Sequence, residues 1–169
     1  MIAQTAVHKI DLMRHFFGEI EEMAAFNGFT GLNAGYHPGG NEDISAFLMK
    51  FESGIIGEAF YLFAAHKVPI PAATGELTIF YGDRGMIHNV MGWHIYSQDI
   101  PEYSGGVTKL EIHQYPYTDS VSAEIRHFLE CIQSGNETVT SVRNNLGTMA
   151  VVDALYQAGE TKSVVKVEK

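Results

Sequence analysis

The chain has 169 residues, 46% of them hydrophobic, which predicts one globular domain over residues 1–169 with a substantial core. Its formal net charge of −9 disfavours a nucleic-acid partner, which would require a basic patch. The single cysteine, the absence of a signal-peptide pattern and the shortness of the apolar stretches predict a cytoplasmic protein without a disulfide or a membrane partner.

The first half of the chain predicts one helix followed by strands. Apolar residues at spacings of three and four predict a helix over residues 8–17, ended by Gly18. Residues 19–29 predict a strand, and residues 30–43, rich in Gly, Pro and Asn, predict a loop. Residues 43–65 predict a hairpin that turns at residues 52–54.

The second half changes from strands to helices. After a loop at residues 66–75, residues 76–97 predict three short strands that turn at residues 82–85 and near Gly92, and residues 105–115 predict one more. Helical periodicity then predicts helices over residues 120–135, capped by Asp119 or Ser120, and over residues 140–159, ended by Gly159. Residues 163–167 predict a last strand.

This order of elements indicates an α+β fold with a mostly antiparallel open β-sheet, because strands and helices follow in separate runs. We expect helices 8–17, 121–133 and 142–157 to pack on one face of the sheet. The strands near residues 44–51 and 55–63 are apolar on both faces. Since monomers rarely expose apolar patches beyond about 300–600 Å², the other face predicts a homo-oligomer formed through the sheet. A long loop folded over that face is the alternative.

A polar pair, Gln4 and His8, precedes the apolar part of the first helix. His8 has an imidazole suited to proton transfer near neutral pH, or it caps the start of the helix. Gln4 can donate and accept hydrogen bonds but cannot take a proton. Asp11 lies three residues before Arg14, a spacing that allows an ion pair.

The remaining histidines form no recognisable metal motif. None of the eight occurs in an H-E-x-x-H pattern, and one cysteine cannot form C-x-x-C, so no metal site is expected. His66 and Lys67 open a Pro-rich loop, where they bind substrate or lie at a solvated tip. His88, Trp93 and His94 belong to the strand region and line either a pocket or an interface.

Several stretches in order resemble the C-terminal domain of the Gfo/Idh/MocA oxidoreductases, the glucose–fructose oxidoreductase and inositol dehydrogenase family. They are "VHKIDLMRHFFGE", "NEDISAFLMKFESGIIGEA", "ELTIFYGDRGMI", "EIRHFLECIQSG" and "SVRNNLGTMAVVDALYQAGETKSVVKV". The resemblance implies that His8 is the catalytic histidine, that Gln4 stands where the family usually has Asp, and that the loop with His66 and Lys67 lies near the substrate. The implied substrate is a small molecule: a sugar, cyclitol or related polyol.

The family's full-length members use NAD or NADP, bound by an N-terminal Rossmann domain, and carry a Glu-Lys-Pro motif. The chain contains neither G-x-G-x-x-G nor Glu-Lys-Pro. A dinucleotide needs a Gly-rich turn and a helix N-terminus for its pyrophosphate. We therefore expect the N-terminal Rossmann domain to be missing, and expect this chain alone to have no cofactor-binding residues and no activity.

Two functions remain open at this point. The chain is either the substrate-binding and oligomerising part of an NAD(P)-dependent oxidoreductase or a non-catalytic, stand-alone ligand-binding or assembly module. An in-frame G-x-G-x-x-G and Glu-Lys-Pro encoded upstream of Met1 would favour the enzyme.

Overall fold

The computed structural model describes residues 2–30, 42–62, 77–112 and 116–168, and the chain divides into two compact units. The first unit combines residues 1–65 with residues 128–169, and the second contains residues 66–127. Within the described ranges, no helix is both long and apolar enough to cross a membrane.

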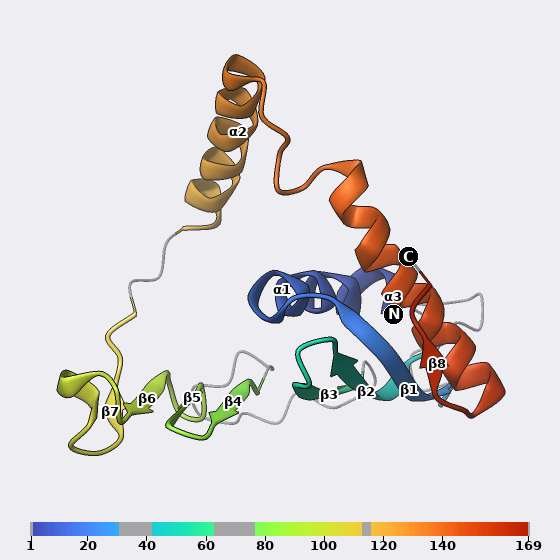
Figure 1. Ribbon diagram of the computed structural model, residues 1–169, viewed down its shortest axis with the longest axis horizontal. Coiled ribbons are helices and arrows are strands. Elements are labelled where there is room, and N and C mark those ends of the chain that lie inside the picture. The colour runs from blue at the N-terminus through green and yellow to red at the C-terminus, as the bar shows by residue number, and fades with distance from the viewer. Residues whose placement is uncertain (1, 31–41, 63–76, 113–115, 169) are drawn as a thin grey trace. The chain divides into compact units, whose positions relative to one another are not determined.

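The first unit is a four-stranded antiparallel sheet with helices on one face (Figure 1). The strand order is β3-β2-β1-β8, α3 packs on β1, and α1 packs on α3. The elements are the π-helix η1 (Ile2–Ala6), the helices α1 (Val7–Phe17) and α3 (Val142–Thr161), and the strands β1 (Ile20–Gly28), β2 (Ile44–Phe51), β3 (Ile56–Leu62) and β8 (Val165–Lys166).

The second unit contains another four-stranded antiparallel sheet, in which each strand pairs with the next along the chain. Its elements are β4 (Ile79–Gly82), β5 (Gly85–His88), β6 (His94–Ser97), the short 3₁₀ helix η2 (Pro101–Tyr103) and β7 (Thr108–Lys109). Helix α2 (Tyr117–Ser134) begins among the residues of this unit and ends among those of the first.

The α+β fold class and the antiparallel pairing are confirmed, whereas the division of the strands into two sheets was not predicted. The predicted caps of α2 are wrong, because this helix begins at Tyr117, directly after Pro116, so Asp119 and Ser120 lie inside it. The fixed φ angle of proline suits the start of a helix, and proline has no backbone N–H group that would need an acceptor within the helix.

The predicted end of α3 at Gly159 is also wrong. The helix continues to Thr161 and ends where Lys162 adopts a left-handed conformation with φ of 55°. Gly159 instead serves packing, because a Cβ atom at this position would collide with the side chain of Asn27 on β1. The glycine therefore lets α3 approach the sheet closely.

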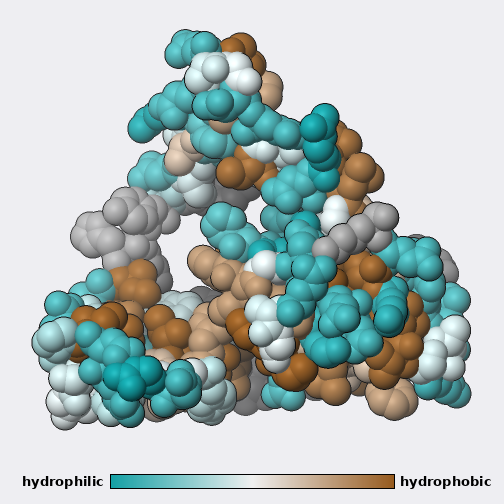
Figure 2. Space-filling view, in the orientation of Figure 1, coloured by the Kyte–Doolittle hydropathy of each residue, from teal (hydrophilic) through white to brown (hydrophobic). Residues whose placement is uncertain are grey.

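Alternation along the strands, interrupted in β1 by a register shift between Ile20 and Glu22, gives the first sheet one buried and one open face. Phe47 and Met49 of β2 are buried and lie opposite Ala25 and Met23 of β1. The intervening residues point the other way, and Phe26 is 76%, Phe60 64% and Leu48 51% exposed. In Figure 2, hydrophobic side chains reach the surface over the part of the molecule that contains this sheet and α3.

Helix α3 contributes much of the core on the covered face. Helical spacing places Leu146, Met149, Val152 and Leu155 on one face of α3, but only Val152 and Leu155 are buried, and Leu146 and Met149 are exposed. At this end of α3 the buried position is held by Thr148, which faces the polar side chain of Arg14 instead of an apolar core. The helix therefore changes from polar to apolar packing along its length.

Helix α2 lies partly in each unit, because the boundary between residues 127 and 128 falls inside it. Its apolar residues Ile125, Phe128, Leu129 and Ile132 are all exposed. Among the residues that the structure describes, the core cluster takes side chains from α1 and α3 but none from α2. The packing of residues 121–133 on the sheet stays a prediction.

Burial predicts a clear contrast between two leucines of α3. Leu155 is 0% exposed and Leu146 is 64% exposed. Leu155→Ala should lower the free energy of unfolding by about 2–5 kcal/mol, because it leaves a cavity in the core. Leu146→Ala, the matched control, should change it by less than about 0.5 kcal/mol. Urea denaturation measures both, and equal losses would contradict the assigned orientation of α3.

Candidate functional site

The candidate site lies where the π-helix η1 runs directly into α1. Single π-helical turns inside helices occur frequently at functional sites. On one face of this helical segment, Ile2 and Ala6 are fully buried. On the opposite face, Gln4 and His8 are exposed, and they lie together because side chains four positions apart share one face of a helix. The turn is therefore anchored by apolar contacts and presents two polar groups to solvent.

Neither polar group is engaged in holding the fold together. In the described part of the chain, the side chains of Gln4 and His8 form no hydrogen bond or ion pair. The N-cap residue of α1 is Ala6, and no side chain caps this helix start. The structure therefore gives no support to His8 as a helix cap and leaves its imidazole accessible to a ligand.

At the other end of α1, a buried arginine fixes the helix to α3. Arg14 donates from Nη2 and Nε to Glu19 at 2.7 and 3.2 Å, and from Nη1 to the Thr148 hydroxyl at 2.6 Å and the Asn144 carbonyl at 3.2 Å. Thr148 donates in turn to Asp11 at 2.6 Å. The predicted Asp11–Arg14 ion pair is present, with Nη1 and Oδ1 at 3.8 Å.

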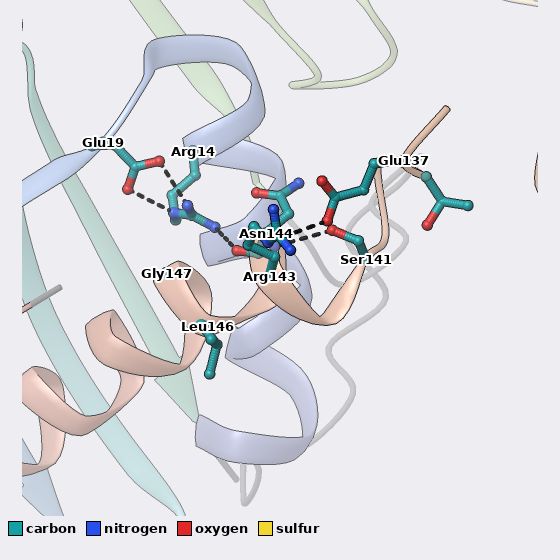
Figure 3. A pocket seen from close by; sticks show the side chains of 9 residues that line it. Arg14, Glu19, Glu137, Ser141, Arg143, Asn144, Leu146 and Gly147 are labelled. Atoms are coloured by element: carbon teal, nitrogen blue, oxygen red, sulfur yellow. Dashed lines mark hydrogen bonds and ion pairs between the residues drawn. The ribbon is translucent and has the colours of Figure 1, made fainter. Parts of the chain in front are cut away.

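A cavity of about 630 Å³ adjoins this network, lined by residues of α1, α3 and the segment before α3 (Figure 3). Its two arginines both face carboxylates: Arg14 faces Glu19, and Arg143 lies 3.8 Å from Glu137. Each arginine of the cavity therefore has an anionic side chain within 4 Å. Gln4 and His8 are not among its lining residues.

The other predicted site residues lie outside the described residues or in the second unit. His66 and Lys67 lie outside the described residues. His88 and His94 lie opposite each other in β5 and β6, with stacked rings 5.0 Å apart. The Nδ1 atom of His88 accepts from the Val90 N–H, and that of His94 bonds to the Gly92 carbonyl. These contacts support a structural role in the hairpin, and no metal-binding group of three or more side chains occurs in the described ranges.

A dinucleotide does not fit the described residues. Its pyrophosphate is normally received by a glycine-rich turn that leads from a strand into a helix N-terminus. Among the described elements no such turn precedes a helix, and the full sequence contains no G-x-G-x-x-G. The described residues therefore do not provide a pyrophosphate-binding turn of this kind.

The sequence and the fold together decide the family. Residues 2–167 match the C-terminal α/β domain of the Gfo/Idh/MocA oxidoreductases. The chain belongs to this family. D-apiose dehydrogenase of Paraburkholderia graminis is 27% identical over 99% of this chain, which covers 45% of that protein.

Solved structures show the same fold at low sequence identity. An oxidoreductase from Agrobacterium radiobacter, solved with NAD⁺, L-tartaric acid and magnesium, matches 99% of this chain and 49% of its own with a TM-score of 0.77 and 22% identity. A levoglucosan dehydrogenase with NADH and levoglucosan matches 98% of this chain and 49% of its own, with a TM-score of 0.74 and 17% identity. The chain thus spans about half the length of the proteins it resembles.

Sequence reasoning missed the partners that α3 provides to α1. Thr148 lies 134 residues from Arg14, and Gly147 lies directly beside the guanidinium. A glycine and a threonine side by side in the interior of a helix are weak helix formers, and this was the available signal. Which residues they face depends on tertiary packing alone.

The substitution Gly147→Ala tests the hydrogen-bond network around Arg14, because it should destabilise the protein although Ala normally stabilises a helix relative to Gly. Inside a helix, Ala is ordinarily more favourable than Gly by about 0.5–1 kcal/mol. At Gly147 an added Cβ would collide with the Arg14 guanidinium and displace a buried cation from its partners. Gly147→Ala should therefore lower the free energy of unfolding, measured in urea, by about 1–3 kcal/mol.

Gly105→Ala is the matched control, because nothing lies within 4 Å of a Cβ added there. This variant should keep its stability. A Gly147→Ala protein as stable as the control would mean that Arg14 does not need the space beside Gly147.

Proposed function

We propose that this chain, as a single domain over residues 1–169, is the substrate-binding and oligomerising part of an NAD(P)-dependent oxidoreductase. The observation that carries the proposal is the exposed Gln4–His8 pair at the junction of η1 and α1, whose side chains form no hydrogen bond or ion pair within the described ranges. Side chains carried by a helix are held more precisely than side chains on a loop, so this position suits a role in ligand binding.

A hydroxyl-rich substrate suits these two side chains. The His8 imidazole would accept the proton of the hydroxyl that is oxidised, since histidine is the side chain most often used for proton transfer in catalysis. The Gln4 amide would donate to one neighbouring hydroxyl and accept from another. A sugar, cyclitol or related polyol is the proposed substrate class, supported by the D-apiose and levoglucosan in the names of similar proteins. His66 and Lys67 stay proposed as further substrate contacts.

The proposed hydride acceptor, NAD or NADP, has no binding turn in this chain. We assign it to the half of the similar proteins that the chain does not span. We propose that this half is a Rossmann domain, which is either part of the same polypeptide or a separate partner of this chain. The 169 residues alone are expected to be inactive.

The lack of a dinucleotide turn also favours a second candidate, a non-catalytic module that binds a small ligand or assembles through its sheet. The DNA upstream of Met1 separates the two. An in-frame G-x-G-x-x-G and Glu-Lys-Pro supports the enzyme, and their absence supports the module.

His8 has a matched control on its own helix in His15, which is also exposed. In a protein that joins this chain to a cofactor-binding half, His8→Ala should lower kcat by roughly 10²–10⁴-fold, because a positioned proton acceptor is lost. His15→Ala should leave kcat unchanged. NAD(P)H absorbance with a panel of aldoses and polyols, including D-apiose and levoglucosan, measures the turnover.

Normal turnover of a folded His8→Ala protein would contradict the catalytic role. Circular dichroism of both variants confirms that any loss of activity is not a loss of fold. A loss of the same size in His15→Ala would show that damage to α1, rather than removal of the His8 imidazole, causes the effect.

The oligomerising role is supported by the open face of the first sheet. Phe26, Leu48, Ile56 and Phe60 project from three adjacent strands on the side away from α1 and α3, and all are more than half exposed. A second copy of the same face is the simplest cover, because most homo-oligomers are closed and symmetric. An obligate contact of this kind buries roughly 2,000 Å² or more.

The two faces of the sheet allow a matched pair of substitutions. Phe60→Asp places a charge on the open face and should give a folded monomer. Phe47→Asp places the same charge in the core and should prevent folding, because an unpaired charge cannot be buried there. Sedimentation at micromolar concentration measures the assembly, and a clean monomer of the unmodified chain would show that no second copy covers this face.

A further inference from the structure

The acidic residue before β2, Glu42, contacts the π-helix from a distant part of the chain. Its Oε1 atom accepts one hydrogen bond from the backbone N–H of Ile2 at 2.8 Å and another from the Tyr156 hydroxyl of α3 at 2.7 Å. A single carboxylate oxygen therefore joins the start of η1 to α3.

The Ile2 N–H needs this acceptor. Ile2 is fully buried, so water is a poor substitute, and buried backbone N–H groups are almost always paired. A carboxylate is a strong acceptor for such a group, so Glu42 is matched to the N–H that it contacts.

The protonation states keep both hydrogen bonds in place near neutral pH. Burial alone would raise the pKa of Glu42, but the bonds from the Ile2 N–H and the Tyr156 hydroxyl hold it below its ordinary value. Burial and the Glu42 carboxylate raise the pKa of Tyr156 to about 12. The carboxylate is therefore a charged acceptor while the hydroxyl remains a donor.

Glu42 is itself held in position by its neighbour. Asp43 is fully buried and accepts hydrogen bonds from the Thr30 backbone N–H at 2.6 Å and from the Thr30 hydroxyl at 2.7 Å. Its own N–H donates to the Gly28 carbonyl at 3.0 Å. The ends of β1 and β2 are thus tied together directly beside Glu42, which fixes the backbone from which its side chain reaches Ile2.

We propose that Glu42 is a positioning residue, which fixes the π-helical turn so that Gln4 and His8 face the substrate. This role rests on the proposed function of Gln4 and His8. Glu42 would affect the reaction only through the orientation of the turn, because its Oε1 atom accepts hydrogen bonds from Ile2 and Tyr156 and has no proposed contact with the substrate.

Amide hydrogen exchange, measured by NMR on the 169-residue chain, tests the anchor without requiring activity. Glu42→Gln keeps the shape of the side chain but removes its charge, and Tyr156→Phe removes one donor. In both variants the Val7 amide, at the end of the π-helical turn, should exchange about tenfold faster through local opening, while the Phe47 and Met49 amides of β2 keep their rates.

Glu22→Gln is the matched control, since it removes an ion pair with Lys50 on the sheet, where the two atoms lie 3.1 Å apart. It should leave all these rates unchanged. An unchanged Val7 rate in Glu42→Gln and Tyr156→Phe, or an equal acceleration throughout β2, would overturn the local anchor.

A double-mutant cycle tests whether the anchor acts through His8, in the protein joined to a cofactor-binding half and with the best substrate of the panel above. Glu42→Gln should lower kcat by roughly tenfold with little change in KM, and should have no further effect once His8 is Ala. An equal loss in both backgrounds overturns the positioning role. Normal turnover of His8→Ala alone defeats the proposed function instead, and the exchange rates then decide the anchor separately.

Discussion

The buried guanidinium of Arg14 is the interaction on which the arrangement of the helices depends. A charged group out of water is tolerated only when its hydrogen bonds are satisfied. Arg14 meets this condition with Glu19, which follows α1, and with the hydroxyl of Thr148 and a backbone carbonyl of α3. A shift of α3 along α1 would break these bonds, so the polar contact sets the register between two helices whose apolar contacts alone would allow sliding.

Arg14 and Glu42 divide the task of holding the first helical segment. Arg14 ties the body of α1 to the beginning of α3, and Glu42 ties the start of η1 to Tyr156 near the end of α3. Apolar side chains such as Ile2 and Ile10 fill the space between the two polar contacts. The segment that carries Gln4 and His8 is therefore fixed at two separated points, and a rigid mounting of this kind is what a binding site requires.

The fold was largely predictable because it depends on local periodicity. Alternation along residues 44–51 and helical spacing along residues 142–157 locate β2 and α3 without tertiary information. Gly18 ends α1 as its position suggests, with φ of 84°. The exposed Leu146 and the packing role of Gly159 could not be predicted, because they depend on what α3 meets at each turn: Arg14 at one end and Asn27 at the other.

The candidate site was predictable in part. The Gln4–His8 pair stands out as a polar break before an apolar helix, but its π-helical turn leaves no mark in the amino-acid pattern. The supporting residues Glu42, Thr148 and Tyr156 are distant in sequence, and ordinary helix or loop positions give no reason to select them. Whether the strands form one sheet or two depends on how the strands pair with one another, and the pattern of each strand alone does not reveal this pairing.

The π-helical turn at Ile2–Ala6 has a consequence for sequence comparison. Such a turn contains one residue more than an α-helical turn, so it is equivalent to a single-residue insertion in a helix. Each residue of an α-helix turns the chain by roughly 100°, from 3.6 residues per turn, and relatives with and without the extra residue therefore present different positions at the same point in space. Where a relative lacks this turn, equal spacing along the sequence would pair Gln4 with a residue that lies elsewhere in space, so the structural counterpart of Gln4 is identified by superposition.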